Sequence, residues 1–420
     1  MEIVPRAVPA TWRPSRQLAL AAYWFSTNFL WASMLTVLLP TEVLRFVPAA
    51  RAPADVGLLT AAGALTALVV HPLSGALSDR TVGQHALARR LGPWVAGRRR
   101  PYFLFGNAAL IIALAVMAFA TGYPALVVAF VLLELASNVT IAPYQALIPD
   151  LVPEGSRGTA SGYMGLMSML GTICSLGLAA IFVHPGRTQP FYGWLILVIA
   201  LGTVVTLVRV PERDAPPTRA PFWVPFRDHG DFWLVFATRA LVMLAFYTVL
   251  AFLELYLKDV LAVRNYVLAT TEVSGLTVAV AAAVALKAGT LSDRFGRRAL
   301  VCGAGLLMGL VAAGFLVVHS LPVVLALGVV FGLGYGAFTS VDWALAVDVL
   351  PGGGTASAAK DFGIWSVAIT LPQALAPGIG GLVVSHFNAA APNLGYQIVF
   401  VMTLAYALAA SLLIWKVRVR

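Results

Sequence analysis

Charged residues are scarce in this chain of 420 residues: Asp, Glu, Lys and Arg make up only 11% of it, whereas hydrophobic residues make up 60%. A soluble globular domain has about 25% charged residues and about half apolar ones. The scarcity of charge therefore excludes a set of water-soluble domains and a disordered chain. The only two cysteines, Cys174 and Cys302, lie inside apolar stretches, which excludes a secreted fold held together by disulfide bonds.

Long apolar runs take the place of the missing charge. A helix that crosses a bilayer needs about 20 mostly apolar residues. Twelve such runs can be placed, at residues 18–40, 55–77, 102–122, 124–148, 158–182, 191–209, 232–257, 272–288, 300–318, 322–347, 360–384 and 395–415. The sequence therefore predicts an all-α membrane protein with 12 transmembrane helices. The first run is too long for the core of a signal peptide and is expected to be retained.

The basic residues predict how these helices are oriented in the lipid bilayer. The net charge of +10 would suggest nucleic acid in a soluble protein, but here most Lys and Arg residues lie before the first run, after the last run and in alternate loops. Basic loops stay on the cytoplasmic side of a membrane. We therefore expect both termini in the cytoplasm and no nucleic-acid partner. The short loops are typical of a bacterial inner (cytoplasmic) membrane protein.

Two halves of the chain repeat one another. The repeated segments are G-A-L-S-D-R at Gly75–Arg80 with G-T-L-S-D-R at Gly289–Arg294, G-R-R at 97–99 with 296–298, and A-L-I-P-D-L-V-P at 146–153 with A-L-A-V-D-V-L-P at 344–351. This repeat predicts two six-helix bundles, residues 1–209 and 232–420, related by pseudo-two-fold symmetry. A proline-rich cytoplasmic linker, residues 210–231, would join them. Parallel halves of this kind are the architecture of the major facilitator superfamily.

The repeated S-D-R motif places an aspartate at the inner end of a helix in each half. A carboxylate there can pair with arginines or accept hydrogen bonds from the N-terminus of a neighbouring helix, and so hold one conformation closed. A simple basic membrane anchor would need the arginines but no aspartate, so the two copies favour a latch. The candidate gating residues are Asp79, Arg80, Asp150, Arg239, Asp293, Arg294 and Asp348.

Four charged residues fall inside predicted spans: Glu134 on the fourth, Arg239 and Glu254 on the seventh, and Asp342 on the tenth. Such residues usually face a cavity or a partner, because each costs at least about 2.5 kcal/mol at the centre of the bilayer. Arg239 and Asp342 are placed to form an ion pair, either a gate or a fixed brace. Glu254, near an outer end, is expected to be hydrated.

Glu134 is the candidate proton carrier, because it lies near mid-membrane and a carboxyl group there can take up and release a proton. The alternative is a structural carboxylate bonded to Asn138. His71, directly before Pro72, is interpreted as a hydrogen-bonded core histidine, with a second proton site as the alternative.

Polar and aromatic side chains recur at helical spacing on three predicted helices. Mixed walls of this kind suit a sugar, because hydroxyl groups need paired donors and acceptors while the apolar faces of pyranose rings pack on indole. The alternative for the two tryptophans is packing against neighbouring helices or lipid. The candidate substrate-binding residues are Trp24, Asn28, Trp31, Asn138, Gln145, Tyr335, Thr339 and Asp342.

The fourth span also resembles a particular branch of the superfamily. L-L-E-L-A-S-N-V-T-I-A-P-Y-Q-A-L-I-P-D-L, residues 132–151, is similar to the helix 4 pattern of sucrose–proton symporters, L-L-D-L-A-N-N-x-x-x-G-P-x-R-A-L-L-A-D-L. S-D-R followed by G-R-R-R-P resembles the loop between helices 2 and 3 of the same family and of the wider glycoside–cation symporters.

This resemblance implies roles for single residues. Glu134 stands in the place of the proposed proton-accepting aspartate, and Asn138, Pro143 and Asp150 match the family pattern, whereas Gln145 replaces an arginine and Ala142 a glycine. The sodium-coupled melibiose branch carries two aspartates on helix 2 where this chain has Ala67 and His71. The resemblance therefore implies coupling to protons rather than to sodium.

The leading hypothesis is a secondary active transporter that carries a sugar or glycoside together with a proton by alternating access, as a monomer. One alternative is a proton antiporter that exports a drug or an amphiphilic metabolite, and another is a non-transporting membrane sensor or assembly factor. We expect no cofactor, no metal site and no enzymatic activity, because no nucleotide-binding loop, metal-ligand cluster or nucleophile–base pair occurs at useful spacing.

Overall fold

The computed structural model describes residues 13–48, 52–82, 94–184, 187–212, 224–351 and 358–418. In these ranges the elements are helical, and twelve helical segments are long and apolar enough to cross a membrane. The predicted all-α membrane fold with 12 spans is confirmed. Residues 213–223, the central part of the predicted linker, lie outside the described residues.

Ten helical elements form the first bundle. They are α1 (Pro14–Ser33), the π-helical turn η1 (Met34–Leu38), α2 (Leu39–Phe46), α3 (Ala52–Arg80), α5 (Arg100–Ala118), α6 (Tyr123–Gln145), α7 (Leu147–Leu151), η2 (Glu154–Ser156), α8 (Arg157–Phe182) and α9 (Gln189–Arg209). The first span combines α1, η1 and α2. Pro40 at the start of α2 cannot donate the next backbone hydrogen bond, which accounts for the widened turn before it.

Seven elements form the second bundle. They are α10 (Gly230–Asp259), α11 (Tyr266–Phe295), α12 (Arg297–Phe315), α13 (Leu321–Val349), α14 (Ala358–Ala390), α15 (Leu394–Leu413) and η4 (Ile414–Lys416). Helices α11 and α14 extend beyond the predicted runs 272–288 and 360–384, because their polar ends remain helical after the apolar stretch stops.

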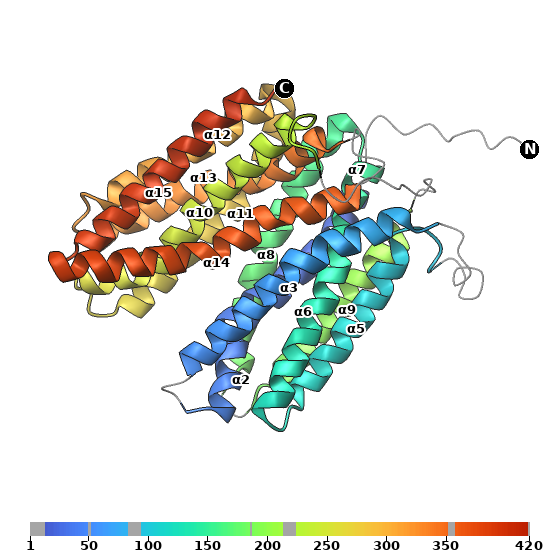
Figure 1. Ribbon diagram of the computed structural model, residues 1–420, viewed down its shortest axis with the longest axis horizontal. Coiled ribbons are helices and arrows are strands. Elements are labelled where there is room, and N and C mark those ends of the chain that lie inside the picture. Colours follow the sequence, from blue (N-terminus) through green and yellow to red (C-terminus); the bar gives the residue numbers. More distant parts are fainter. Residues whose placement is uncertain are drawn as a thin grey trace, which may run out of the picture.

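The two bundles lie against each other at one end of the molecule and diverge toward the other (Figure 1). The end where they meet carries α7, the first turns of α5 and α12, and the C-terminal η4, and we call it the basic end. The bundles contact each other through α3 on α14 and through α8 on α11 and α13. The opposite end carries α2 and the turn from α5 to α6.

Repeated glycines permit the close approach of the bundles. A Cβ atom at Gly75 of α3 would overlap the backbone of Ala359 in α14, and a Cβ atom at Gly289 of α11 would overlap α8 at Gly158 and Gly162. Gly75 and Gly289 are the first residues of the two repeated S-D-R segments, so the duplication preserves small residues where helices from different bundles touch.

The backbone at the start of each G-R-R segment is also similar in the two halves. Gly97 and Gly296 begin the two G-R-R segments, and both have positive φ angles, 122° and 88°. Residues with a side chain rarely adopt this backbone conformation, which explains the glycine at both positions. Each glycine directly precedes the arginines at the start of a helix, α5 in one bundle and α12 in the other.

Candidate functional site

Glu134 lies near the middle of α6, buried between α6 and α3, with 8% of its surface exposed. The Nδ2 atom of Asn138, one turn further along, donates hydrogen bonds to the Glu134 carbonyl oxygen at 2.7 Å and to Oε2 at 3.1 Å. Gly63 of α3 faces the carboxyl group, and a Cβ atom there would overlap Oε1. In the described part of the chain Glu134 forms no ion pair.

The polar residues predicted on α1 contact two neighbouring helices of the first bundle. The indole Nε1 of Trp31 donates to Ser137 Oγ on α6 at 3.2 Å. Ser168 Oγ on α8 donates to Asn28 Oδ1 at 2.6 Å. Both α1 side chains are half-buried, so each keeps part of its surface accessible.

Trp24 of α1 joins the two bundles through an aromatic contact. Its ring meets Trp343 of α13 edge to face, with 5.0 Å between the ring centroids, and it stacks on Tyr144 of its own bundle at 6.2 Å. Trp343 in turn contacts the rings of Phe362 and Trp365 on α14. This aromatic cluster therefore spans the contact between the bundles.

Arg239 of α10 and Asp342 of α13 form a buried ion pair within the second bundle. The distance from Arg239 Nε to Asp342 Oδ2 is 3.3 Å, and the two side chains are 2% and 5% exposed. The guanidinium carbon lies 3.1 Å from the centroid of the Trp365 ring, a cation–π contact. The pair thus belongs to the same aromatic cluster that contacts Trp24. Glu254, at the other end of α10, is exposed.

The remaining predicted substrate residues lie on α6 and α13. Ser366 Oγ of α14 donates to Gln145 Oε1 at 3.2 Å, so Gln145 reaches across to the second bundle. On α13 the ring of Tyr335 stacks on Phe246, with 4.0 Å between centroids, and Thr339 donates to the Tyr335 carbonyl oxygen at 3.0 Å. Tyr335 and Thr339 are both half-buried.

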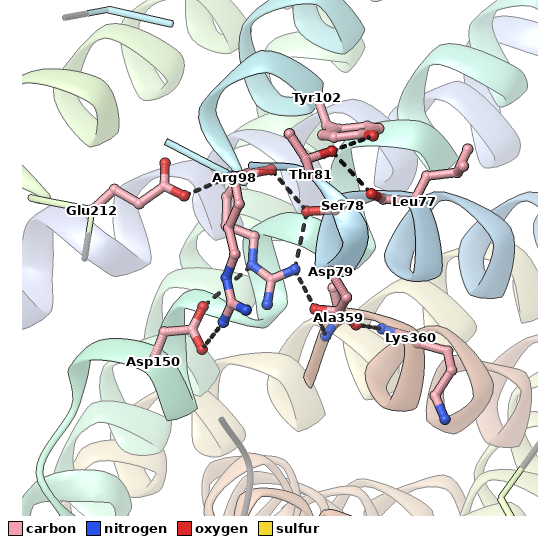
Figure 2. Close-up of polar contacts among 11 residues, drawn as sticks. Leu77, Ser78, Asp79, Thr81, Arg98, Tyr102, Asp150, Glu212, Ala359 and Lys360 are labelled. Carbon is pink, nitrogen blue, oxygen red and sulfur yellow. Dashed lines mark hydrogen bonds and ion pairs between the residues drawn. The ribbon is translucent and has the colours of Figure 1, made fainter. Parts of the chain in front are cut away.

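The first predicted latch lies where α3 ends at the basic end (Figure 2). It consists of Asp79, Arg99, Asp150 and the first turn of α14. Asp79 accepts hydrogen bonds from the backbone N–H groups of Ala359 at 3.4 Å and Lys360 at 2.9 Å, in the first turn of α14. Arg99 NH1 lies 2.5 Å from Asp79 Oδ1, and Arg99 Nε lies 3.2 Å from Asp150 Oδ2. A carboxylate of one bundle therefore caps a helix of the other and is itself neutralised by a buried arginine.

The second latch repeats this arrangement in the other half. Asp293 at the end of α11 accepts from the backbone N–H groups of Gly158 and Thr159 in the first turn of α8, both at 3.1 Å. Arg297 lies 3.7 Å from Asp293 and also pairs with Asp348. Each bundle thus contributes one carboxylate to the helix N-terminus of the other, as the pseudo-two-fold axis requires.

Two predicted gating arginines are not part of either latch. Arg80 and Arg294 are exposed, and neither forms an ion pair within the described ranges. Arg294 lines an open pocket of about 690 Å³ beside the second latch, which Trp415 also lines.

Glu212 is a residue that sequence reasoning missed. Its carboxylate accepts from the backbone N–H group of Arg99 at 2.6 Å (Figure 2). The carboxylate accepts from the backbone N–H group of Arg100 at 3.1 Å as well, and so caps α5. It also fills the space beside Gly97, where a Cβ atom would overlap it. Burial raises the pKa of the Glu212 carboxyl, while the two backbone hydrogen bonds and the arginine charges partly offset that increase. The start of the linker is thereby attached to the first latch.

A buried ion pair at the start of α14 was also missed. Lys360 Nζ lies 3.0 Å from Asp361 Oδ1, and the two side chains are 5% and 0% exposed. Lys360 donates its backbone N–H to Asp79, so this pair adjoins the first latch. In the sequence, two adjacent charges of opposite sign at the edge of an apolar run look the same as a hydrated helix end. They therefore did not indicate a buried ion pair.

Replacement of Glu212 by Gln is expected to remove a pH-dependent part of the stability. Because the folded-state pKa of Glu212 is raised, its contribution is fully present below the ordinary pKa of a glutamate and is lost as the pH rises through the raised value. The melting temperatures of the parent and of Glu212→Gln should therefore differ in their pH dependence. The effect should be about 1 kcal/mol or less, because the backbone hydrogen bonds and the arginine charges offset part of the cost of burial. Glu154→Gln, at an exposed position of the same end, is the matched control, and identical pH profiles for all three proteins would contradict the assignment.

In the described ranges no group of three or more His, Cys, Asp and Glu side chains is arranged to hold a metal ion. What the geometry provides is an isolated carboxyl group within a span, half-buried aromatic and hydrogen-bonding side chains near the contact between the bundles, and two paired latches at one end.

The sequence profile of the Major Facilitator Superfamily matches residues 18–359 and 268–420 of the chain. Among curated proteins, the sucrose transport protein SUC4 of Arabidopsis thaliana is 30% identical over 195 residues, covering 42% of this chain and 33% of that protein. The sucrose transport protein SUT2 of Oryza sativa subsp. indica is 27% identical over 289 residues, covering 57% of this chain and 55% of that protein. The matches thus cover between about a third and about half of the length of these relatives.

Solved structures with the same fold are more distant in sequence. A bacterial homologue of the iron transporter ferroportin, in an outward-facing state, has a TM-score of 0.73 at 15% identity and covers 96% of this chain and 99% of its own. The human organic anion transporter MFSD10 (TETRAN) has a TM-score of 0.69 at 18% identity and covers 96% of this chain and 100% of its own. At these identities the similarity shows the fold alone.

Proposed function

The chain belongs to the major facilitator superfamily and is therefore a multi-pass membrane transporter, and we propose that it carries a sugar or glycoside together with a proton by alternating access. In this proposal the basic end and both termini face the cytoplasm, the protein works as a monomer, and the membrane is a bacterial inner membrane. The positive-inside rule and the short loops support the orientation and the location.

The observation that carries proton coupling is the environment of Glu134. The side chain is buried in a transmembrane helix, its Oε2 atom has a neutral amide as its hydrogen-bond donor, and no cation of the described chain pairs with it. An ionised carboxylate without a partner is far more costly in such surroundings than a neutral carboxylic acid. Glu134 is therefore expected to bind a proton whenever it is shielded from water. Asp342 does not need to bind a proton when it is shielded from water, because Arg239 balances its charge.

The choice of a sugar is supported by side chains of α1 and α13. The rings of Trp24, Trp31 and Tyr335 and the polar side chains of Asn28 and Thr339 are all half-buried. Such groups can pack on the apolar face of a pyranose ring and satisfy its hydroxyl groups. The names of the sucrose transport proteins point to the same class of ligand.

The arrangement of the bundles fits one state of the transport cycle. The latches hold the basic end together, and Figure 1 shows the bundles diverging toward the opposite end. With the basic end in the cytoplasm, this is an outward-facing state that would receive substrate and proton from outside. Release to the cytoplasm would then require both latches to break.

Uptake of radiolabelled disaccharides into proteoliposomes, with and without an imposed inward proton gradient, tests the proposal. Accumulation above the external concentration is expected only with the gradient. Equal uptake in both conditions would show facilitated diffusion and contradict proton coupling. Extrusion of a fluorescent dye by energised vesicles, without uptake of any sugar, would replace the symport proposal with that of an exporter.

A further inference from the structure

The repeated G-R-R turn binds a carboxylate in the first half of the molecule. Gly97 has a positive φ angle, and Arg99 and Arg100 donate their backbone N–H groups to the Glu212 carboxylate at 2.6 Å and 3.1 Å. A Cβ atom at Gly97 would overlap the same carboxylate. The cavity that Arg99, Arg100 and Glu212 line measures only about 20 Å³. This turn is therefore a site for an anionic group, and here the chain itself supplies that group.

The same turn is open in the second half. Gly296 also has a positive φ angle, and Arg298 and Ala299 stand at the places of Arg99 and Arg100 in the repeat. No side chain of the described residues accepts a hydrogen bond from the backbone N–H group of Arg298 or Ala299. The turn instead forms part of the wall of the open pocket of about 690 Å³, which Gly296, Arg298 and Ala299 line.

Three charged residues of this pocket are already paired with one another. Arg297 lies 3.7 Å from Asp293 and also pairs with Asp348, and all three side chains line the pocket. The Asp293 carboxylate is further engaged by the N-terminus of α8 in the second latch. These three residues therefore hold the latch together and are not the groups that would attract a ligand.

Two further arginines of the pocket keep their charge unbalanced. Arg294 is exposed, and Arg298 donates from NH1 to the backbone carbonyl oxygen of Val417 at 2.7 Å. Neither forms an ion pair within the described ranges. Guanidinium groups and the backbone N–H groups at a helix N-terminus both bind phosphate oxygens. The start of α12 therefore offers a phosphate group the backbone donors that Glu212 uses in the first half, together with two cationic side chains.

The remaining polar and aromatic residues of the pocket suit a sugar. Trp415 is 55% exposed, and its Nε1 atom donates to Sγ of Cys302 at 3.2 Å. The face of its indole ring can pack on the apolar face of a pyranose ring. Glu154 is exposed, and its carboxylate can accept from sugar hydroxyl groups. The volume of the pocket lies within the range of about 300–1,000 Å³ that is typical of small-molecule sites.

We propose that this pocket binds a phosphate ester, a soluble sugar phosphate, and that the bound ligand holds the basic end closed. The phosphoryl group lies at the turn before α12, with Arg294 and Arg298, and the sugar packs on Trp415. Glu154 belongs to the first bundle and the other three residues to the second, so one ligand contacts both bundles beside the second latch.

A ligand that binds only the closed arrangement of the bundles stabilises that arrangement. The occupied pocket therefore opposes opening of the basic end. With the basic end in the cytoplasm, a sugar phosphate that accumulates there reduces further import. This regulatory step rests on the proposed sugar transport, whereas binding at the pocket does not.

Calorimetric titration of the purified full chain with glucose 6-phosphate tests the site without any transport. We expect saturable binding to the parent and an affinity about tenfold lower in Arg294→Gln, as for the loss of one hydrogen bond between charged groups. Arg80→Gln is the matched control, because Arg80 is exposed at the same place in the first S-D-R segment, and it should bind like the parent. Equal affinity in the parent and in Arg294→Gln, or no binding to either, would overturn the proposal.

Two further titrations identify the source of the phosphate group. Trp415→Ala should weaken the binding of glucose 6-phosphate but leave that of inorganic phosphate unchanged, and equal losses for both would exclude sugar packing on the indole ring. Native mass spectrometry of protein from nanodiscs that contain phosphatidylglycerol gives the other arm. Retention of this lipid by the parent but not by Arg294→Gln, without binding of glucose 6-phosphate, would overturn the sugar phosphate and assign the pocket to a lipid headgroup.

Sugar exchange in proteoliposomes tests the regulatory effect. With glucose 6-phosphate on both sides of the membrane at ten times its dissociation constant, exchange of labelled sugar should fall about tenfold in the parent. The ratio of exchange with and without the phosphate should stay close to one in Arg294→Gln. Undiminished exchange in a parent that binds the phosphate would overturn the regulatory effect. Binding of the phosphate without sugar exchange in any of the proteins would instead refute the proposed transport of sugar and leave the phosphate site standing.

Discussion

Replacement of Glu134 by Gln is expected to abolish uphill accumulation of sugar while leaving exchange of sugar across the membrane. The amide keeps the size of the side chain and can still contact Asn138, but it cannot bind or release a proton. With a gradient of one pH unit, one proton per sugar supplies about 1.4 kcal/mol, enough for a tenfold accumulation. The internal concentration should therefore fall from about tenfold to equality with the outside, measured with labelled sugar in proteoliposomes.

Glu254→Gln provides the matched control for this experiment. Glu254 is also a carboxylate in a transmembrane helix, but it is exposed near the end of α10. Its replacement should leave accumulation unchanged. If Glu134→Gln accumulates sugar as far as the parent does, the role assigned to Glu134 is wrong, however well the protein transports.

Loss of both latches is expected to convert the molecule to a state that is open at the basic end. In the double variant Asp79→Asn and Asp293→Asn, each helix N-terminus across the contact loses its carboxylate, and Arg99 and Arg297 each lose one ion-pair partner. Breaking the buried pair of Asp79 and Arg99 costs about 3–5 kcal/mol. Asp293 is more exposed, and loss of its hydrogen bonds to the N-terminus of α8 costs about 1.5–3 kcal/mol. Inverting a 99 to 1 population takes about 5.5 kcal/mol, so two latches together are sufficient.

Spin labels can measure this change directly. Val82 and Phe295 are exposed at the basic end, one in each bundle, and can carry labels after the native cysteines are replaced. The distance between the labels should increase in the double variant and remain that of the parent in Asp228→Asn, an exposed aspartate of the same end. An unchanged distance distribution in the double variant would show that the two carboxylates do not hold the basic end closed.

The sequence predicted the fold well because each helix that crosses a lipid bilayer needs a long apolar run. Long apolar runs specified the 12 spans, and repetition of the S-D-R and G-R-R segments indicated two equivalent bundles. The resemblance to the major facilitator superfamily is confirmed by the family match. The helix ends were less predictable, since α11 and α14 continue into polar residues that make tertiary contacts.

The candidate site was only partly predictable. Charged residues inside apolar runs, such as Glu134 and Asp342, were conspicuous because each is the only charged residue in its run. Glu212 was not conspicuous, because charged residues are common in a proline-rich linker. Its contact with the start of α5 forms only in the folded chain.

The most direct test of proton-coupled transport is the pH of a weakly buffered suspension of proteoliposomes when sugar is added without any imposed gradient. The mechanism predicts that the external medium becomes more alkaline as sugar enters, with one proton removed per sugar, and that Glu134→Gln abolishes the change. Entry of sugar with no change in external pH would contradict it.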